Sequence, residues 1–483
     1  MPRARHVVAR GVSLDEASEE AHIHLSVVAR VPGAHAGAVL AVAALDDPDP
    51  DARFPWFVST SVDGTVSTWH VEERGAGGIE LVRDASFGDD DAPWWCLAVD
   101  DEWLFAGTHG RKVKVRLAVD ADLESLPGAI ANHTGWVRAL ASVRKTPREL
   151  ERARAVRPRK ASLRKASKSQ SASAAADDAT PPPTTGDAWR FSAACNVVRV
   201  WQDSFAFDEN DENDEDDEDD EDDGAVADVG SARIFTGDIL CLAGVRASFR
   251  GELFERFLIA GVADGTVRGW RVREAPLSRT DGSLGTDAPV MLPIREFADL
   301  RGGRVAALFP LSEAFPDDDV LSRFVVAGCR DGALGCVDAE TMRVSPRIAA
   351  HERRRSSETE TRRTEGVACV CAGPANTVAS GGDDGIVRLW RPRVRREREV
   401  GDEPINTFST CVVLEPCGGD NDTVCPDALT DDTKIETRSH GDRAAPSHGT
   451  RCLCAVRDKR SGECFGALAG DEAGGLALYS VFV

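Results

Sequence analysis

The sequence lacks the features of a membrane or secreted protein. Among its 483 residues there is no apolar run approaching the roughly 18 that a membrane span requires. The first residues, MPRARHVVARGVSLDE, include arginines but no continuous apolar segment, which argues against a secretory signal. The acidic Asp15, Glu16, Glu19 and Glu20 argue against an organellar transit peptide. We therefore expect an intracellular protein of the cytoplasm, the nucleus or both, which is not secreted and has no membrane partner.

Sequence motifs that carry out chemistry are also absent. GGDDG at 381–385 is not the GxxxxGK[ST] loop that cradles a phosphate, and the GxSxG turn of a nucleophilic serine does not occur. The 10 histidines mostly precede expected strands, where a structural role is the simpler interpretation. Cys411, Cys417 and Cys425 are too widely spaced for the usual paired zinc ligands. We expect no catalytic residues, no metal site and no cofactor, and hence no enzyme.

Charge and cysteine content narrow the choice of partners. The formal net charge of −23 opposes nonspecific attraction to nucleic acid or to anionic lipid. The 13 cysteines, without a secretory signal, indicate reduced thiols in a reducing compartment. Both observations favour an intracellular protein whose partners are other proteins or peptides.

A repeated pattern is what the sequence has instead of such motifs. Residues 378–390 read VASGGDDGIVRLW, an extended run, a tight turn at Asp384-Gly385, and an alternating run that ends at Trp390. Alternation suits a pleated strand, and Asp-Gly suits the turn that joins two antiparallel strands. Six further segments follow the pattern, the last three more weakly: 57–69, 258–270, 325–337, 105–116, 191–201 and 468–479. Seven copies of one unit indicate a repeat fold.

The seven copies resemble the repeats of the WD-repeat family, each of which folds as one blade of a β-propeller. The motif is clearest in the copies that end at Trp69, Trp270 and Trp390. It is degraded where another residue replaces the tryptophan, at Arg116, Val337 and Tyr479. The resemblance implies an all-β, seven-bladed β-propeller of the WD-repeat type. Because the last repeat ends after its third strand, we expect residues 22–31 to complete the last blade as an N-terminal strand and so to close the ring.

Composition divides the chain into an arm, a propeller and insertions. We expect residues 1–21 to form a disordered N-terminal arm and residues 22–483 to form the propeller. Four insertions interrupt it: a basic segment at 143–188, an acidic segment at 205–230, and loops at 351–365 and 392–447. The charged insertions should stay unfolded, because runs of charge with few apolar residues cannot bury a core.

The resemblance also implies a structural polar network in the well-preserved blades. It joins a histidine before the inner strand, a serine or threonine on the second strand, the turn aspartate and the tryptophan. By position, the sets are His35, Ser59, Asp63 and Trp69 in blade one, and His351, Ser380, Asp384 and Trp390 in blade six. Blade four keeps Asp264 and Trp270, with Ala260 and no histidine, and partial sets pair His133 with Trp201 and His448 with Tyr479.

Each expected inner strand has a small residue two places after its first apolar residue. The strands nearest the axis of a ring are the most crowded, so a bulky side chain there would overpack. Cysteine acts as a small hydrophobe in such a position. The column comprises Ala41, Cys96, Ala139, Cys241, Ala307, Cys371 and Cys454. Its cysteines are therefore expected to serve packing rather than metal binding.

Candidate partner-binding residues lie where the chain runs into the inner strands. Loops on a rigid scaffold commonly carry function, and tryptophan is a usual anchor of interfaces. The candidates are Trp94, Trp136, His133 and His448. Trp94 and Trp136 could equally begin the core strands.

Three serines follow basic residues and resemble substrate sites of basophilic kinases: Ser162, Ser167 and Ser356. Phosphorylation of Ser162 and Ser167 would add negative charge to the basic insertion and loosen it from the acidic one. The alternative is that all three are chance matches in solvated loops.

The leading hypothesis for function is a non-catalytic scaffold or adaptor, a monomeric propeller within a complex, that assembles multiprotein complexes. A second is the substrate receptor of a cullin-type ubiquitin ligase. The segments Trp270-Arg271-Val272-Arg273 and Trp390-Arg391-Pro392-Arg393, however, lack the aspartate of the Trp-Asp-x-Arg pattern that such receptors commonly carry. A third is RNA-linked assembly, for instance in ribosome maturation, with nucleic acid bound through the basic residues 144–168.

Overall fold

The computed structural model is almost entirely β-strand. It describes residues 24–45, 52–74, 78–89, 91–100, 103–117, 123–125, 133–144, 188–201, 228–233, 237–249, 253–274, 289–316, 318–351, 366–398, 408–417 and 449–482. No helix in these ranges is long and apolar enough to cross a membrane. The expected arm at 1–21, most of the four insertions, Ser162, Ser167, Ser356 and His448 lie outside the described residues.

The first four blades follow one another along the chain. Blade one contains β2 (Val39–Leu45), β3 (Trp56–Ser61), β4 (Thr65–Arg74) and β5 (Gly78–Gly88). Blade two contains β6 (Trp94–Asp100), β7 (Trp103–Thr108), β8 (Val113–Leu117) and β9 (Glu124–Ser125). Blade three contains β10 (Val137–Arg144), β11 (Ala188–Ala194), β12 (Val197–Trp201) and β13 (Asp228–Arg233). Blade four contains β14 (Ile239–Phe249), β15 (Leu253–Val262), β16 (Thr266–Glu274) and β17 (Pro289–Pro293), with β18 (Ala298–Asp299) also paired to β16.

The last three blades use the rest of the chain and its first strand. Blade five contains β19 (Val305–Pro310), β20 (Phe324–Cys329), β21 (Ala333–Asp338) and β22 (Ile348–Ala349), with two short 3-10 helices, η2 (Leu311–Glu313) and η3 (Leu321–Arg323). Blade six contains β23 (Val367–Gly373), β24 (Thr377–Gly382), β25 (Val387–Arg398) and β26 (Phe408–Pro416). Blade seven contains β27 (Thr450–Arg457), β28 (Cys464–Asp471), β29 (Leu476–Phe482) and β1 (His24–Val31).

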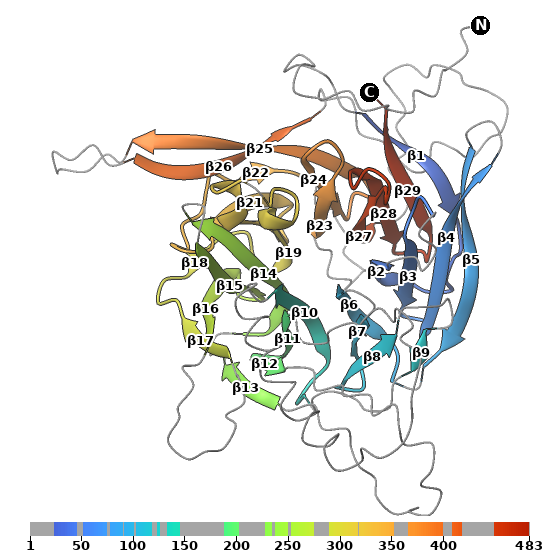
Figure 1. Ribbon diagram of the computed structural model, residues 1–483, viewed down its shortest axis with the longest axis horizontal. Helices are drawn as coiled ribbons and strands as arrows, with labels where there is room; N and C mark the ends of the chain where they lie inside the picture. The colour runs from blue at the N-terminus through green and yellow to red at the C-terminus, as the bar shows by residue number, and fades with distance from the viewer. Residues whose placement is uncertain are drawn as a thin grey trace, which may run out of the picture.

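The blades stand around a common axis (Figure 1). Within each blade the strands pair antiparallel, and in the first six blades they follow sequence order from the inside outward. Each inner strand contacts the inner strands of both neighbouring blades, so that β2, β6, β10, β14, β19, β23 and β27 form a closed ring. The seven sheets confirm the predicted seven-bladed β-propeller.

The two ends of the described chain meet in blade seven. β1 pairs antiparallel with β29, from His24 opposite Phe482 to Val31 opposite Leu476. In Figure 1 the blue β1 accordingly lies beside the red β29. The strand order β1-β29-β28-β27 makes β1 the outer strand of this blade. The expected closure of the ring by an N-terminal strand is confirmed.

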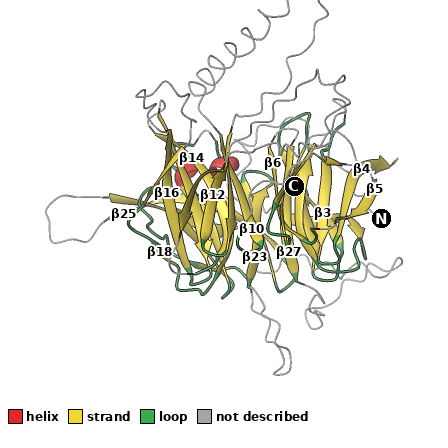
Figure 2. Cartoon of the chain, turned by 90° about the horizontal axis from the view of Figure 1, so that it is seen from below, coloured by secondary structure: helices red, strands yellow, loops and turns green. Residues whose placement is uncertain are grey.

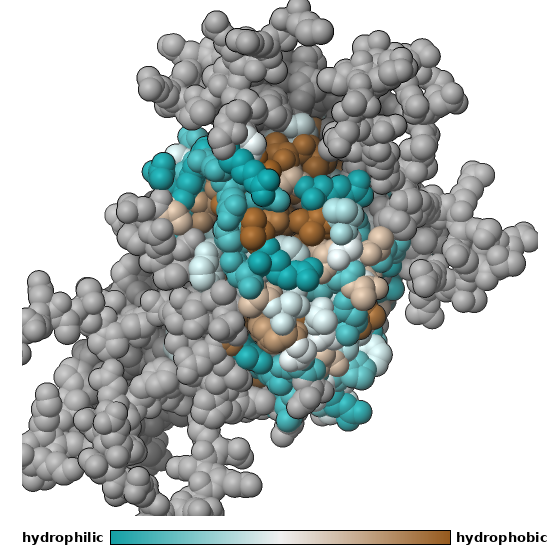
Figure 3. All heavy atoms as spheres, turned by 90° about the vertical axis from the view of Figure 1, so that its right-hand side faces the viewer, coloured by the Kyte–Doolittle hydropathy of each residue, from teal (hydrophilic) through white to brown (hydrophobic). Residues whose placement is uncertain are grey.

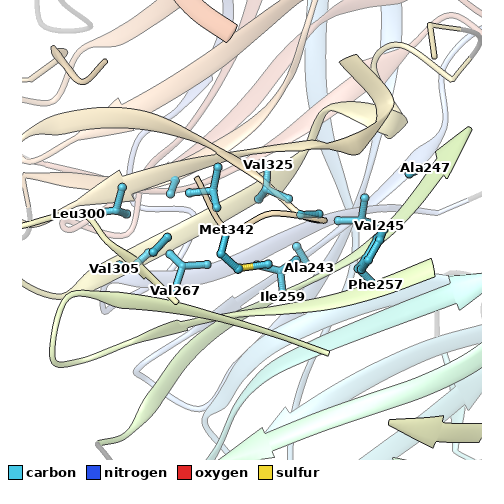
Figure 4. Packing of buried hydrophobic residues seen from close by; sticks show 14 of the residues in the cluster. Ala243, Val245, Ala247, Phe257, Ile259, Val267, Leu300, Val305, Val325 and Met342 are labelled. Carbon is cyan, nitrogen blue, oxygen red and sulfur yellow. The ribbon is translucent and has the colours of Figure 1, made fainter. Parts of the chain in front are cut away.

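Alternating apolar residues fill the spaces between blades. Between blades four and five, Phe257 and Ile259 of β15 pack with Val325 of β20 (Figure 4). Between blades seven and one, Leu468 packs with Trp69. Figure 3, which views the molecule from the side of β4 and β5, shows hydrophobic residues gathered between hydrophilic ones. Burial of each such side chain contributes roughly 1.5–3 kcal/mol, so contacts between blades are a major source of stability.

Every inner strand begins with a β-bulge, at which its register to the second strand shifts. The residue after each bulge is small: Ala41, Cys96, Ala139, Cys241, Ala307, Cys369 and Cys452. The prediction that Cys371 and Cys454 hold this position in blades six and seven is therefore wrong, because Cys369 and Cys452 hold it. Residues two apart on a strand share a face, and only the register distinguishes Cys369 from Cys371.

The position after the bulge is crowded by its own blade and by the next one. In blade four, a Cβ built on Gly261 would lie 2.5 Å from Cys241 Sγ and 2.8 Å from Val305 Cγ1 of blade five. Five blades place a glycine opposite the small residue: Gly107, Gly261, Gly328, Gly381 and Gly470. The missing side chains allow neighbouring blades to approach closely near the axis.

The expected loop at 392–447 is wrong at its beginning. β25 continues to Arg398, and β26 pairs with it from Pro416 opposite Trp390 to Phe408 opposite Arg398. The many arginines of this segment favoured a solvated loop, but its neighbour Val412 is fully buried in the cluster between blades five and six. Figure 2 shows β25 extending beyond the ring. The insertion at 143–188 also begins and ends within strands, because β10 reaches Arg144 and β11 begins at Ala188, and the insertion at 205–230 ends within β13, which begins at Asp228.

Candidate functional site

Blade one holds a chain of hydrogen bonds among the expected residues. Ser59 Oγ accepts a hydrogen bond from Trp69 Nε1 at 2.8 Å and lies 2.7 Å from His35 Nε2. His35 Nδ1 lies 2.7 Å from Thr65 Oγ1, which donates to Asp63 Oδ1 at 2.6 Å. Asp63 itself is 3.9 Å from that ring nitrogen, so Thr65 links the two. The consistent donor order runs from Trp69 through Ser59, His35 and Thr65 to Asp63, which assigns the imidazole proton to Nδ1.

Blade six builds the same network with a direct contact between histidine and aspartate. Ser380 Oγ accepts from Trp390 Nε1 at 2.8 Å and lies 2.7 Å from His351 Nε2. His351 Nδ1 is 2.9 Å from Asp384 Oδ1, and Arg388 donates to Asp384 Oδ2 at 2.6 Å. Burial alone would raise the pKa of Asp384, but His351 and Arg388 hold it below its ordinary value. The residues therefore form a buried and fully partnered network.

Blade three departs from the expectation at its histidine, whereas blade four keeps the expected aspartate and tryptophan without a histidine. His133 is 5% exposed, and its Nε2 lies 2.7 Å from Ser192 Oγ, so its assignment as a partner-binding residue is wrong. Burial, together with the charge of Arg199, lowers the pKa of His133 to about 4. In blade four, Asp264 accepts hydrogen bonds from the N–H and the hydroxyl of Thr266 at 2.9 and 2.7 Å. Trp270 is buried beside this turn-capped hairpin, without a histidine.

The histidine and the serine of this network occur together in the described blades. His35, His133 and His351 face Ser59, Ser192 and Ser380, whereas the register puts alanine at the serine position in the other blades: Ala106, Ala260, Ala327 and Ala469. The backbone N–H of each histidine also donates to a turn carbonyl of the preceding blade: Gly474, Arg111 and Gly332, at 2.8–2.9 Å. The network thus joins neighbouring blades, and its role is structural.

Blade two replaces the network with an ion cluster that sequence reasoning missed. Arg116 occupies the tryptophan position on β8, and its guanidinium lies 3.1 Å from Asp89 Oδ2. Lys114 Nζ lies 2.7 Å from Asp89 Oδ1 and 3.1 Å from Asp91 Oδ2. Burial alone would raise the pKa of Asp89, but hydrogen bonds from Lys114, the Asp91 N–H and Arg116 hold it below its ordinary value. The available signal was the alternation of Lys114 and Arg116 on one strand, after the run of three aspartates at 89–91.

Trp94 is a core residue. It begins β6, is 1% exposed, and packs with Val58 and Leu104 between blades one and two. Its assignment as a partner-binding residue is therefore wrong, and the alternative that it begins a core strand is correct.

Trp136 lies on the surface and belongs to an aromatic group. It is 39% exposed and stacks on Trp95, with ring centroids 5.5 Å apart and an interplanar angle of 10°. The His109 ring lies 4.6 Å from the Trp136 ring. The Arg138 guanidinium lies 5.6 Å from the Trp95 ring and 5.4 Å from the Trp136 ring. These four residues are called the Trp136 cluster below.

Topology places the Trp136 cluster on one face of the ring, between blades two and three. Trp95 and Arg138 lie in the first two residues of β6 and β10, and His109 lies in the turn between β7 and β8. In an antiparallel blade, the segment leading into the first strand and the turn between the second and third strands leave from the same face, called the upper face below. Two other exposed apolar residues, Val62 and Phe297, also lie in connections on the upper face. Trp95 was predictable in part, because consecutive strand residues point to opposite sides and only one of Trp94 and Trp95 could enter the core.

The Trp136 cluster has the composition of an interface anchor. It combines flat aromatic surface with a guanidinium held by two indoles, and tryptophan and arginine are the residues that most often dominate binding energy. Among the described residues, no group of three or more His, Cys, Asp and Glu could hold a metal ion. The aromatic rings and the guanidinium of the cluster suit recognition of another molecule.

Comparison with known proteins finds a family model that matches one segment of the chain and solved structures of similar fold. The family model described as "WD domain, G-beta repeat" matches residues 357–391, which include β23 and β24 of blade six. Two solved structures, described as "Crystal structure of RRP9 WD40 repeats" and "Structure of U3-55K", are similar to the chain with TM-scores of 0.49 and 0.48 and 13% identity each. In both, the likeness covers 95% of this chain and 98% of the other. No curated protein matches the sequence. Seven antiparallel blades closed around one axis make the chain a seven-bladed β-propeller, and the WD-repeat model matches part of one of these blades.

Proposed function

We propose that the chain is a non-catalytic scaffold that assembles multiprotein complexes and binds a protein or peptide partner through the Trp136 cluster. Propellers of the WD type are typically interaction scaffolds. The observation that carries the proposal is the exposure of Trp136, which is 39%, whereas Trp69 and Trp94 are each 1% exposed. Tryptophan and arginine are among the residues that most often dominate binding energy at an interface, and both occur in this cluster.

The surroundings of Trp136 favour binding without rearrangement. Stacking on Trp95 and contact with His109 hold the ring in place, and Trp95 is itself anchored in the inner strand β6. A side chain fixed before binding loses little conformational entropy when the partner arrives. The upper face therefore presents a preformed anchor on a rigid ring.

A purification experiment tests the proposal. Full-length wild-type protein and the Trp136→Ala variant are used as baits in cell extract, and the recovered proteins are quantified by mass spectrometry. Leu292→Ala is the matched control, because Leu292 is 42% exposed on the outer strand β17 and away from the cluster. We expect a specific set of proteins to be lost with Trp136→Ala and kept with Leu292→Ala. An unchanged set with Trp136→Ala would reject the proposal, and recovery of ligase adaptor proteins would favour the ubiquitin-ligase role.

A second candidate function is RNA-linked assembly. The two-stranded ribbon of β25 and β26 favours this function, because it exposes Arg393 and Arg395. In the described part of the chain, Glu415 is the one acidic residue that pairs with these two arginines. Binding of a labelled RNA should then fall steeply with salt and should weaken in the Arg393→Gln/Arg395→Gln variant. The expected contribution of residues 144–168 is tested by their deletion, because these residues lie almost wholly outside the described ranges.

The intracellular location expected from the sequence remains part of the proposal. It is supported by the use of cysteine as a packing residue, since Cys369 and Cys452 are buried beside the ring axis as free thiols. Microscopy of the tagged protein distinguishes cytoplasm from nucleus.

A further inference from the structure

Two arginines occupy equivalent positions in different blades but have different partners. Arg138 in β10 and Arg451 in β27 each lie in the bulge at the start of the inner strand, immediately before Ala139 and Cys452. In the other blades this position is uncharged, with Leu40, Trp95, Leu240, Ala306 and Ala368. The guanidinium of Arg451 is paired with the carboxylate of Glu472.

Arg138 has no such carboxylate among the described residues. The register puts Cys195 where blade seven has Glu472, because Val137 pairs with Ala194 as Thr450 pairs with Asp471. The contacts of the Arg138 guanidinium are instead the faces of Trp95 and Trp136. Its N–H groups are thus left for an acceptor that this part of the chain does not supply.

The surroundings of Arg138 add hydrogen-bond donors and positive charge. Trp95 Nε1 is buried and has no acceptor among the described residues. The turn that carries His109 continues with Arg111 and Lys112, and no described carboxylate lies within salt-bridge distance of either side chain. Asp89 and Asp91, in the connection between β5 and β6, are paired with Lys114, and Asp89 is also paired with Arg116. This part of the upper face therefore has an excess of donors, on a chain whose formal net charge is −23.

We infer that Arg138 receives a carboxylate from an acidic peptide segment of the partner, next to a side chain that packs on Trp136. This inference rests on the proposed function and names the chemistry of its partner. A guanidinium binds a carboxylate through two parallel hydrogen bonds, and its planar stacking on two indoles fixes the orientation that this geometry requires. The adjoining aromatic surface suits an apolar side chain of the same peptide.

A peptide fits this site better than a nucleic acid. Binding to a phosphate backbone depends on several cations acting together, and the strongly negative net charge of the chain opposes it. One oriented guanidinium beside two indoles is instead suited to one carboxylate within a mainly apolar contact. The test below includes a nucleic acid probe, so that binding of nucleic acid at this site would be detected.

The test uses the full chain and a library of short random peptides displayed on phage. Four immobilised proteins are compared: wild type, Arg138→Gln, Arg451→Gln and Trp136→Ala, each shown by its melting temperature to be folded. We expect peptides recovered by the wild type to be enriched in Asp and Glu, and the enrichment to disappear with Arg138→Gln and persist with Arg451→Gln. A synthetic copy of the most enriched peptide should bind Arg138→Gln about tenfold or more weakly, the loss of one charge-assisted hydrogen-bonding group.

A second variant supplies the missing carboxylate from within the chain. Cys195→Glu places an acid where blade seven has Glu472, and it should weaken the same peptide by neutralising Arg138 without removing it. If the wild-type pool shows no acidic enrichment, or Arg138→Gln keeps it, the inference is overturned. If binding depends on Trp136 alone, the proposed function stands and the carboxylate inference fails. If no peptide is recovered above a blank surface, the proposed function and the carboxylate inference both fail. The inference is also overturned if the peptides show no acidic enrichment and the wild type instead binds labelled oligouridylate in a way that Arg138→Gln abolishes.

Discussion

Arg53 of blade one and Asp458 of blade seven are 405 positions apart in the sequence, yet Arg53 Nε donates a hydrogen bond to Asp458 Oδ2 at 2.7 Å. Arg53 also contacts Glu73 and lies over the rings of Phe54 and Phe465. This contact joins the first and last blades independently of the pairing of β1 with β29. The ring is thus closed twice, by a strand and by a side-chain clasp.

We expect Arg53→Ala to lower the free energy of unfolding by about 1 kcal/mol, the value for a partly exposed ion pair with added packing. Denaturant unfolding followed by circular dichroism measures the change. Arg74→Ala is the control, because the Arg74 side chain is 66% exposed and, within the described part of the chain, pairs only with Glu80. Equal effects of the two variants would contradict the clasp.

The polar network of blade one predicts different costs for two turn aspartates. Asp63 and Asp264 each accept two hydrogen bonds from the following threonine, but Asp63 also accepts the Ala36 N–H at 2.6 Å and ends the chain of bonds through His35. Asp63→Ala should cost about 1–3 kcal/mol, because partners are left unsatisfied in a partly buried site. Asp264→Ala should cost less. Thermal melts that rank the two variants in the reverse order would exclude this role for Asp63.

The buried histidines predict loss of stability in mild acid. Burial lowers the pKa of His133 from 6.5 to about 4. Between these values the unfolded chain binds the proton and the folded chain does not, so the stability is complete above pH 6.5 and is lost as the pH falls toward 4. The melting temperature should therefore decrease over this window, and His133→Gln should make the decrease shallower.

His70 provides a control of opposite sign. Burial lowers its pKa, but hydrogen bonds with Glu72 and Asp84 outweigh this effect and raise it above the ordinary value. His70 therefore adds stability at low pH that is lost as the pH rises, and His70→Gln should make the acid-side decrease steeper. A parallel response of the two variants would show that the histidines do not control this slope.

Close packing at the axis predicts that Gly261→Ala is destabilising. The new Cβ would lie 2.5 Å from Cys241 Sγ and 2.8 Å from Val305 Cγ1, and such overpacking costs about 1–3 kcal/mol. Gly88→Ala is the matched control, because nothing lies within 4 Å of a Cβ built there. Denaturant midpoints that fall equally for both glycines would argue against a packing limit at the axis.

The fold could be predicted from local signals. Asp384-Gly385 and Trp390 define a hairpin in any context, and seven spaced copies of it imply blades. The register within a blade was harder, because Cys369 and Cys371 share a face and the bulge that selects between them depends on the second strand. The sequence did not predict β26, because β25, the strand with which it pairs, is rich in arginine and resembles a solvated loop. Val412 of β26 is buried by contacts with blade five, which are not visible in the local sequence.

The site could be predicted only in part. Trp94 and Trp136 both stand near the start of an inner strand in the sequence, yet Trp94 is the first residue of β6 and is buried, whereas Trp136 lies one residue before β10 and is exposed. Equally, nothing local distinguishes Arg138 from Arg451, because the difference is the presence of Glu472 in the turn after β28 of one blade. Charge and aromatic content indicate candidate binding residues in the sequence. Only the tertiary structure decides which of these residues stay exposed or without a partner inside the described chain.

The Trp136 cluster is the surface through which we propose that the propeller binds its partner. The most direct measurement is oxidative footprinting of Trp136 by mass spectrometry, in the free protein and in the complex purified with it, with the outer-strand residue Leu292 as internal reference. We expect the oxidation of Trp136 to fall strongly in the complex and that of Leu292 to stay unchanged. Equal oxidation of Trp136 in both states would contradict this proposal.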